Sequence, residues 1–120
     1  MAERPLVHVV DDDEALRDSL RLALEGAGYE CRVHESGVAF LAAPFDPALG
    51  VALVDVRMPG LDGLELPRAL KARGVRLPVI FMTGHGDVPL AVAAMKGGAA
   101  DFVEKPCDFR SLAAAIERAL

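Results

Sequence analysis

Strand-length apolar runs recur along the whole chain. Most of them are continuous and rich in β-branched residues, as in strands that are buried on both faces. They predict five strands, at residues 6–10, 31–34, 51–55, 78–83 and 100–103. The run at 31–34 alternates between apolar and polar residues, which indicates a strand nearer the edge of the sheet.

Helical spacing of apolar residues fills the segments between these runs. Between residues 16 and 27, apolar side chains recur every three or four positions, and Gly28 is placed to end that helix. Before the third helix, Asp62 and Glu65 have the spacing of a capping box, with Pro67 about one turn in. Residue types that favour helix N-termini precede each helix. The N-caps predicted in this way are Asp13, Ser36, Asp62, Asp87 and Asp108.

The alternation of strand and helix predicts a doubly wound α/β domain. Parallel strands need crossover helices, and right-handed crossovers place those helices on both faces of the sheet. No repeat, low-complexity tract or linker interrupts the pattern, so residues 1–120 are expected to form one domain.

Composition and charge narrow the class of protein. Apolar residues make up 52% of the chain and charged residues 26%, and no apolar run reaches the roughly 18 residues of a membrane span. The N-terminus shows no signal-peptide cleavage pattern, so a cytoplasmic location without membrane contact is expected. The net charge of −5 and the scattered basic residues predict no direct binding to nucleic acid. Cys31 and Cys107 lack metal or redox spacing and are interpreted as reduced packing residues.

Chemically active residue types follow four of the five predicted strands. The first strand runs into Asp11 and Asp12, the third ends on Asp55, the fourth ends on Thr83, and Lys105 stands two residues after the fifth. Taken alone, Asp55 would be interpreted as a helix or turn cap. In an open α/β sheet, however, the carboxyl ends of the strands form one ligand-binding edge, so these residues are expected to meet.

This grouping favours magnesium-assisted phosphoryl chemistry. Three neighbouring carboxylates repel one another unless a cation lies between them, and oxygen ligands of this kind suit Mg²⁺. A lysine and a threonine hydroxyl supply the positive charge and the hydrogen-bond donor that phosphoryl oxygens require. One carboxylate could then attack phosphorus and hold the group as an acyl phosphate. Asp55 is the candidate nucleophile because it stands alone at a central strand end.

The ordered set of Asp11, Asp12, Asp55, Thr83 and Lys105 followed by proline resembles the receiver domain of bacterial two-component response regulators. The segments 82–89 and 101–106 are further similar to the FixJ-like branch, whose members usually couple a receiver to a helix-turn-helix DNA-binding domain. The resemblance covers essentially the whole chain. It implies a flavodoxin-like (βα)5 three-layer sandwich with five parallel strands in the order 2-1-3-4-5. It also implies that phosphorylation controls transcription through a DNA-binding domain. That domain is either attached to the receiver or absent.

The resemblance assigns a role to each matching residue. Asp55 would accept the phosphoryl group from a sensor histidine kinase or from a small donor such as acetyl phosphate. Asp12 and Asp55 would bind Mg²⁺ directly, Asp11 would act through water, and the backbone carbonyl of Arg57 would be a further ligand. Lys105 would pair with the incoming phosphoryl oxygens.

Thr83 and Phe102 would form the switch that the resemblance implies. Thr83 would move to bind the phosphoryl group, and Phe102 would turn into the space that Thr83 leaves. This movement would alter the face formed by the fourth helix, the fifth strand and the fifth helix. Phosphorylation is therefore expected to promote homodimerisation through that face, and the peptide bond between Lys105 and Pro106 is expected to be cis.

Two other functions stay open at this point. A Mg²⁺-dependent phosphatase of the haloacid dehalogenase kind also uses an aspartyl nucleophile at a strand end. It needs a second acid two residues later, where this chain has Arg57, and a cap domain for its substrate. A stand-alone receiver that acts only by protein contact is the other alternative. For a receiver, no substrate turnover is expected beyond weak autophosphorylation from small donors and autodephosphorylation.

The three histidines receive separate interpretations. His8 and His34 lie on strand patterns beside apolar residues and are interpreted as partly buried structural residues. His85 follows Thr83 in a glycine-flanked loop, where it either contacts a phosphorylated loop or partner or is exposed to solvent.

Overall fold

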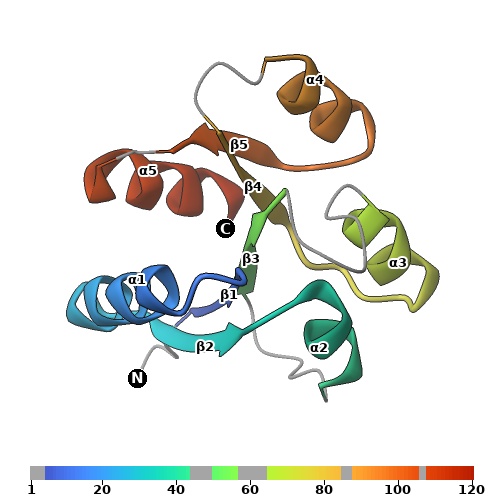
Figure 1. Cartoon of the computed structure of the whole chain (residues 1–120). Coiled ribbons are helices and arrows are strands. Elements are labelled where there is room, and N and C mark those ends of the chain that lie inside the picture. Colours follow the sequence, from blue (N-terminus) through green and yellow to red (C-terminus); the bar gives the residue numbers. More distant parts are fainter. Residues whose placement is uncertain (1–4, 44–49, 57–64, 85–87, 106–107) are drawn as a thin grey trace.

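Five strands and five helices alternate along the chain in a computed structural model that describes residues 5–43, 50–56, 65–84, 88–105 and 108–120 (Figure 1). The strands are β1 (Leu6–Val10), β2 (Glu30–His34), β3 (Gly50–Asp55), β4 (Val79–Thr83) and β5 (Asp101–Glu104). The helices are α1 (Glu14–Gly26), α2 (Gly37–Ala42), α3 (Leu66–Ala72), α4 (Val88–Lys96) and α5 (Phe109–Ala119). All five predicted strands are present, and each of their ends lies within one residue of the prediction.

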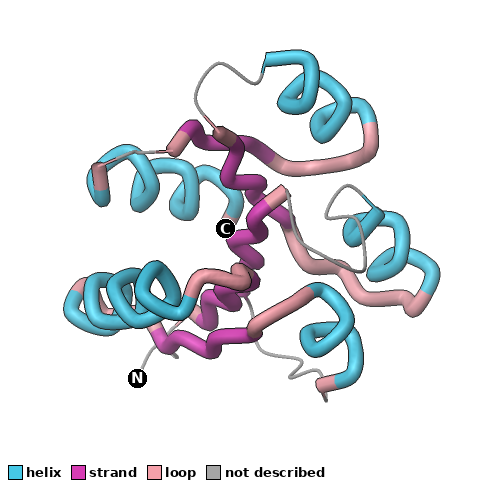
Figure 2. The backbone as a smooth tube through the Cα atoms, viewed as in Figure 1, coloured by secondary structure: helices cyan, strands magenta, loops and turns pink. Residues whose placement is uncertain are grey.

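The strands form one parallel sheet in the order β2-β1-β3-β4-β5. Figure 2 shows this sheet as the central layer, with helices on both sides of it. The observed order confirms the predicted doubly wound α/β fold, and β2 is an edge strand as its alternating pattern indicated.

Each face of the sheet is covered by its own group of helices. On one face, α1 and α5 pack against alternate strand residues, and this core includes Val9, Leu53 and Ile116. On the other face, α2, α3 and α4 pack against the intervening strand residues, and this second core includes Val54 and Phe81. In Figure 1, α1 and α5 lie to the left of the sheet, and the other three helices lie to its right. Because both faces are covered, β1, β3 and β4 are buried almost throughout, which explains their continuous apolar runs.

Gly50 is required where β3 begins. A Cβ atom at this position would lie 2.3 Å from the carbonyl oxygen of Leu6, its partner in the register of β1 and β3. Any side chain would therefore force the two central strands apart at their amino ends.

The helix ends agree with the local signals in three places. The Asp13 carboxylate accepts hydrogen bonds from the N–H groups of Ala15 and Leu16, at 3.0 and 3.3 Å. Side chains of Ser36 and Asp108 likewise accept N–H bonds three residues on, and so cap α2 and α5. The predicted caps Asp62 and Asp87 lie outside the described residues.

The predicted start of α3 is described only in part. The α-helix runs from Leu66 to Ala72, and Glu65 directly before it already has helical backbone angles. The capping box that begins at Asp62 stays a prediction, because residues 62–64 lie outside the described residues. Pro67 lies in the first turn of the helix, where proline is best tolerated because it has no N–H to donate.

None of the helices in the described ranges is long and apolar enough to cross a membrane.

Candidate functional site

The register of the sheet brings the predicted site residues to one edge. Val10 of β1 is aligned with Val54 of β3. The residues that follow them, Asp11 and Asp55, therefore lie at the same level of the sheet. Further along the sheet, Asp55 is aligned with Met82, so Thr83 lies one position beyond it. The backbone N–H of Lys105 donates to the carbonyl of Thr83 at 2.7 Å, which fixes the end of β5 beside the end of β4. All four positions therefore lie at the carboxyl edge, as the sequence predicted.

The alternation of strand side chains divides these residues between the two faces. Asp55 continues the row of β3 side chains that faces α1 and α5, and Asp11 and Lys105 continue the corresponding rows of β1 and β5. Thr83 continues the opposite row, which includes Phe81 and faces α2, α3 and α4. The acids and the lysine thus form one cluster, and the threonine stands at its border toward the other helix layer.

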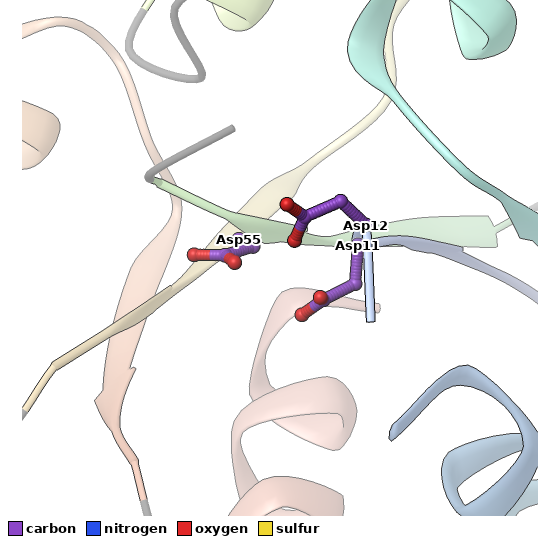
Figure 3. Close-up of side chains that lie close together, drawn as sticks. All are labelled: Asp11, Asp12 and Asp55. Atoms are coloured by element: carbon purple, nitrogen blue, oxygen red, sulfur yellow. The ribbon is translucent and has the colours of Figure 1, made fainter. Parts of the chain in front are cut away.

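Three carboxylates converge at this edge. One oxygen from each of Asp11, Asp12 and Asp55 lies within 4.8 Å of the other two, and Figure 3 shows the three side chains close together at this edge. Asp11 is buried, Asp55 is half-buried and Asp12 is exposed, so the cluster opens to solvent on the Asp12 side. An all-oxygen donor set with several negative charges and an open side fits a hard divalent cation that keeps part of its water shell.

Lys105 bridges the cluster. Its Nζ lies 3.0 Å from Asp11 Oδ2 and 3.4 Å from Asp55 Oδ2. Burial by itself would lower the pKa of Lys105, but the hydrogen bonds and charges of Asp11 and Asp55 outweigh burial, and the pKa lies above its usual value. Lys105 therefore stays protonated and offsets one of the negative charges.

Asp11 is held rigidly by its neighbours. Its Oδ1 accepts the backbone N–H of Asp13 at 2.9 Å, while its own backbone N–H donates to the carbonyl of His34 at 3.1 Å. The Arg17 side chain on α1 donates to the Asp11 carbonyl at 2.7 Å. The role of Arg17 was not predicted, because nothing in the sequence shows that this side chain turns back toward the strand end.

Thr83 and Phe102 occupy neighbouring strands next to the cluster. Thr83 is buried, and its hydroxyl is 3.5 Å from the carbonyl oxygen of Val103, at the long limit of a hydrogen bond. Phe102 is half-buried and packs against the core formed with α2, α3 and α4, aligned with Phe81 in the sheet. The weak contact of the Thr83 hydroxyl leaves it able to exchange its partner for a stronger acceptor.

A cavity between α1 and α5 also gives access to the Lys105 side chain. Its volume is about 600 Å³, and it is lined mainly by apolar side chains such as Leu20, Phe109 and Leu112, with Lys105 at its border. Lys105 retains 31% of its side-chain exposure, so a ligand can approach the ion pairs from solvent.

A second polar cluster is formed by His8 on β1 and His34 on β2, and the sequence did not predict that these residues meet. His8 Nδ1 and His34 Nε2 are 3.1 Å apart, and both rings contact the ring of Phe40. His8 is 4% exposed, which agrees with the interpretation of both histidines as structural. Burial, followed by the charge of Arg32, lowers the pKa of His34. The two histidines are 26 residues apart, so only the pairing of β1 with β2 brings them together.

Four residues with predicted roles lie outside the described residues, in addition to the caps Asp62 and Asp87. They are Arg57, His85, Pro106 and Cys107. The carbonyl ligand, the loop histidine, the cis peptide bond and the second cysteine therefore stay predictions.

A five-stranded parallel sheet with this strand order, and with acids and a lysine at its carboxyl edge, defines the class of receiver domains. The profile of the family described as "Response regulator receiver domain" matches residues 7–117, and the chain belongs to this family. A receiver domain is a regulatory module and not a classical enzyme.

Similar proteins place the chain in the FixJ-like branch. The transcriptional regulatory protein FixJ from Azorhizobium caulinodans is 53% identical over 120 residues, which are all of this chain and 57% of FixJ. The DNA-binding transcriptional regulator NtrC from Salmonella typhimurium is 46% identical over 118 residues, 98% of this chain but 25% of NtrC. The chain therefore spans little more than half of FixJ and a quarter of NtrC.

Solved structures agree with this placement. The crystal structure of FixJ-N has a TM-score of 0.91 and 47% sequence identity, over 98% of this chain and 94% of that one. Full-length FixJ from B. japonicum gives a TM-score of 0.86 at 47% identity, over 98% of this chain and 58% of that one. These matches confirm the predicted receiver fold and branch, and they do not favour the haloacid dehalogenase alternative.

Proposed function

We propose that this chain is a phosphorylation-activated receiver in which Asp55 takes a phosphoryl group from a sensor histidine kinase. The observation that carries the proposal is the bridging of Asp11 and Asp55 by Lys105, beside the carboxylate of Asp12. In this arrangement Asp55 would supply the nucleophilic oxygen, Lys105 the positive charge and the carboxylates a cation site, all at the carboxyl edge of the sheet.

The transfer step follows from these groups. An Asp55 carboxylate oxygen forms a bond to phosphorus, and the bond from phosphorus to the imidazole nitrogen of the donor phosphohistidine breaks. The electron pair of the broken bond goes to that nitrogen. The kinase histidine leaves as a neutral imidazole when its other ring nitrogen carries a proton, and otherwise it takes up one proton from solvent to become neutral. As the bond forms, Lys105 exchanges its contact with Asp55 Oδ2 for the phosphoryl oxygens and keeps its pair with Asp11. A small donor such as acetyl phosphate would transfer its group in the same way.

Mg²⁺ would be held by Asp12 and Asp55 directly and by Asp11 through water, with the carbonyl of Arg57 as the further ligand. When bound, it would neutralise negative charge shared by the carboxylates and the phosphoryl oxygens. The exposed position of Asp12 and the burial of Asp11 support this division, because Asp11 is already paired with Lys105.

Thr83 and Phe102 would convert phosphorylation into a change of surface. The long contact between the Thr83 hydroxyl and the Val103 carbonyl would be replaced by a charge-assisted hydrogen bond to the phosphoryl group. Phe102 packs in the core layer that also contains α4, so an inward rotation would change the surface formed by α4, β5 and α5. Two apolar side chains of α4 are already exposed there, Val92 at 47% and Met95 at 42%, which supports phosphorylation-dependent homodimerisation through this face.

Asp55→Asn tests the phosphorylation site. Incubation with acetyl phosphate and Mg²⁺ should add one phosphoryl group to the wild-type chain, detectable as a mass increase of one phosphate, and none to the variant. Asp18→Asn is a matched control, because it removes an exposed carboxylate from the middle of α1 and should label like the wild type. Undiminished labelling of Asp55→Asn would refute the assignment.

Sedimentation velocity tests the dimer. The chain treated with beryllofluoride, a mimic of the phosphoryl group, should sediment as a dimer at micromolar concentration, and the untreated chain as a monomer. An unchanged monomer after treatment would count against the proposed face.

The wider role is also part of the proposal. Residues 1–120 would act as one receiver domain that controls transcription through an attached or separate DNA-binding domain. Autodephosphorylation would be slow, and a cytoplasmic location remains a prediction.

A further inference from the structure

A groove of about 510 Å³ lies away from the phosphorylation site, between α3 and the turn that follows α4. Its lining combines apolar and basic side chains. Val75 and Leu77 are half-buried and supply apolar surface above the buried Leu70, and Arg68, Lys71 and Arg76 supply positive charge. Figure 1 shows α3 and α4 side by side on the same face of the sheet.

The three cations of the groove are exposed. Within the described part of the chain, no carboxylate lies within ion-pair distance of any of them. Arg73, which is also in this segment, differs because its guanidinium donates to the carbonyl of Leu41. Ion pairs with other described residues therefore do not explain why Arg68, Lys71 and Arg76 are basic.

The helix dipole explains only one of the three. Lys71 lies in the last turn of α3, where a positive charge is favoured. Arg68 lies in the first half of the same helix, where a positive charge is not favoured, and Arg76 lies beyond its end. Arg68 and Lys71 are three residues apart and so point to the same side of α3.

The groove lies in a positive segment of a negative chain. Residues 65–100 contain five of the chain's 13 lysines and arginines and two of its 18 acidic residues, Glu65 and Asp87, although the whole chain has a net charge of −5. An acidic partner would therefore be attracted to the groove.

We propose that this groove is a docking site for an acidic, amphipathic segment of a partner protein. Apolar side chains of the segment would pack on Val75 and Leu77, and its carboxylates would pair with the surrounding cations. A volume of about 510 Å³ has room for a few side chains of such a segment. A nucleic-acid backbone fits less well, because phosphates would leave the apolar floor uncovered and three exposed cations give weak affinity.

The test uses a fluorescein-labelled peptide of about 12 residues, in which Leu recurs at helical spacing among Asp and Glu. Fluorescence anisotropy should show saturable binding to the full chain that weakens as NaCl is raised from about 50 to about 300 mM. Arg76→Glu and Lys71→Glu should each weaken binding by about three- to tenfold, since each replaces an attractive charge by a repulsive one. Arg110→Glu makes the same change of net charge on the exposed surface of α5 and should bind like the wild type.

Three results would overturn the proposal. Equal binding to wild type and Arg76→Glu, or no binding at all, would show that the groove is not the site. Equal binding of a peptide with Leu replaced by Ser would show that the apolar floor is not used. Competition by a short DNA duplex at the same concentration, or self-association of the chain that Arg76→Glu abolishes, would assign the groove to nucleic acid or to a second copy.

Discussion

Replacing Lys105 by Met removes the charge that bridges Asp11 and Asp55 and keeps a side chain of similar length. At an effective dielectric constant of about 20, charges separated by 3.0 or 3.4 Å attract by about 5 kcal/mol each before any cost of desolvation. Exposed ion pairs contribute about 0–1 kcal/mol net, whereas breaking a buried pair costs about 3–5 kcal/mol. Lys105 is 31% exposed and Asp11 is 1% exposed, so we expect a loss of about 2 kcal/mol in the free energy of unfolding.

Mg²⁺ should reverse much of this loss. Lys105→Met removes the ammonium group that offsets the charge of the carboxylates. A divalent ion therefore relieves more repulsion among the carboxylates in the variant than in the wild type. By thermodynamic linkage, the gain in Mg²⁺ affinity equals the difference between the stability losses without and with Mg²⁺, so complete recovery of about 2 kcal/mol corresponds to a gain of about 30-fold. The stability difference between the two proteins should therefore be large in EDTA and small in saturating MgCl₂.

Urea unfolding followed by circular dichroism measures both effects. Midpoints should shift while the slopes of the transitions stay equal, because the surface exposed on unfolding is unchanged. Arg118→Met is the matched control: its pair with Asp101 at 2.9 Å is 65% exposed on the arginine side, so its loss should cost less than about 1 kcal/mol and be independent of Mg²⁺. The reasoning fails if Lys105→Met is as stable as the wild type in EDTA, or if Mg²⁺ stabilises both proteins equally.

Three further predictions concern the fold. Gly50→Ala should lower the free energy of unfolding by about 3 kcal/mol in urea titrations, because the new Cβ would lie 2.3 Å from the Leu6 carbonyl oxygen. The lowered pKa of His34 means that the unfolded chain binds more protons, so stability should fall as the pH drops below about 6.5, and His34→Gln should flatten this dependence. Burial, then the charge of Glu25, raises the pKa of Cys31 to about 11. Iodoacetamide at pH 8 should therefore alkylate Cys31 at least about 100-fold more slowly in the native chain than in the chain unfolded by urea, as measured by peptide mass spectrometry.

Each of these predictions has its own control. Gly26→Ala adds a Cβ with no atom within 4 Å and should change stability by less than about 1 kcal/mol, so an equal loss at Gly26 and Gly50 would exclude the steric explanation. An identical pH dependence of wild type and His34→Gln would show that His34 does not titrate between the two states. Rapid alkylation of Cys31 in the native chain would contradict its burial.

Periodicity in the sequence was enough to predict the architecture. Continuous apolar runs, helical spacing and the caps Asp13, Ser36 and Asp108 depend on residues within a few positions of one another. The edge at which the strands end could be predicted for the same reason, since parallel strands all finish on one side. The sequence alone therefore placed Asp11, Asp55, Thr83 and Lys105 together.

Only the tertiary structure decided how these residues are paired. Lys105 reaches Asp11 because strand register and the alternation of side chains place both on the face covered by α1 and α5, and register is a long-range property. The same holds for the contact between His8 and His34, which depends on the pairing of β1 with β2. Local signals thus determine the elements, whereas contacts between residues far apart in sequence determine which charges neutralise one another.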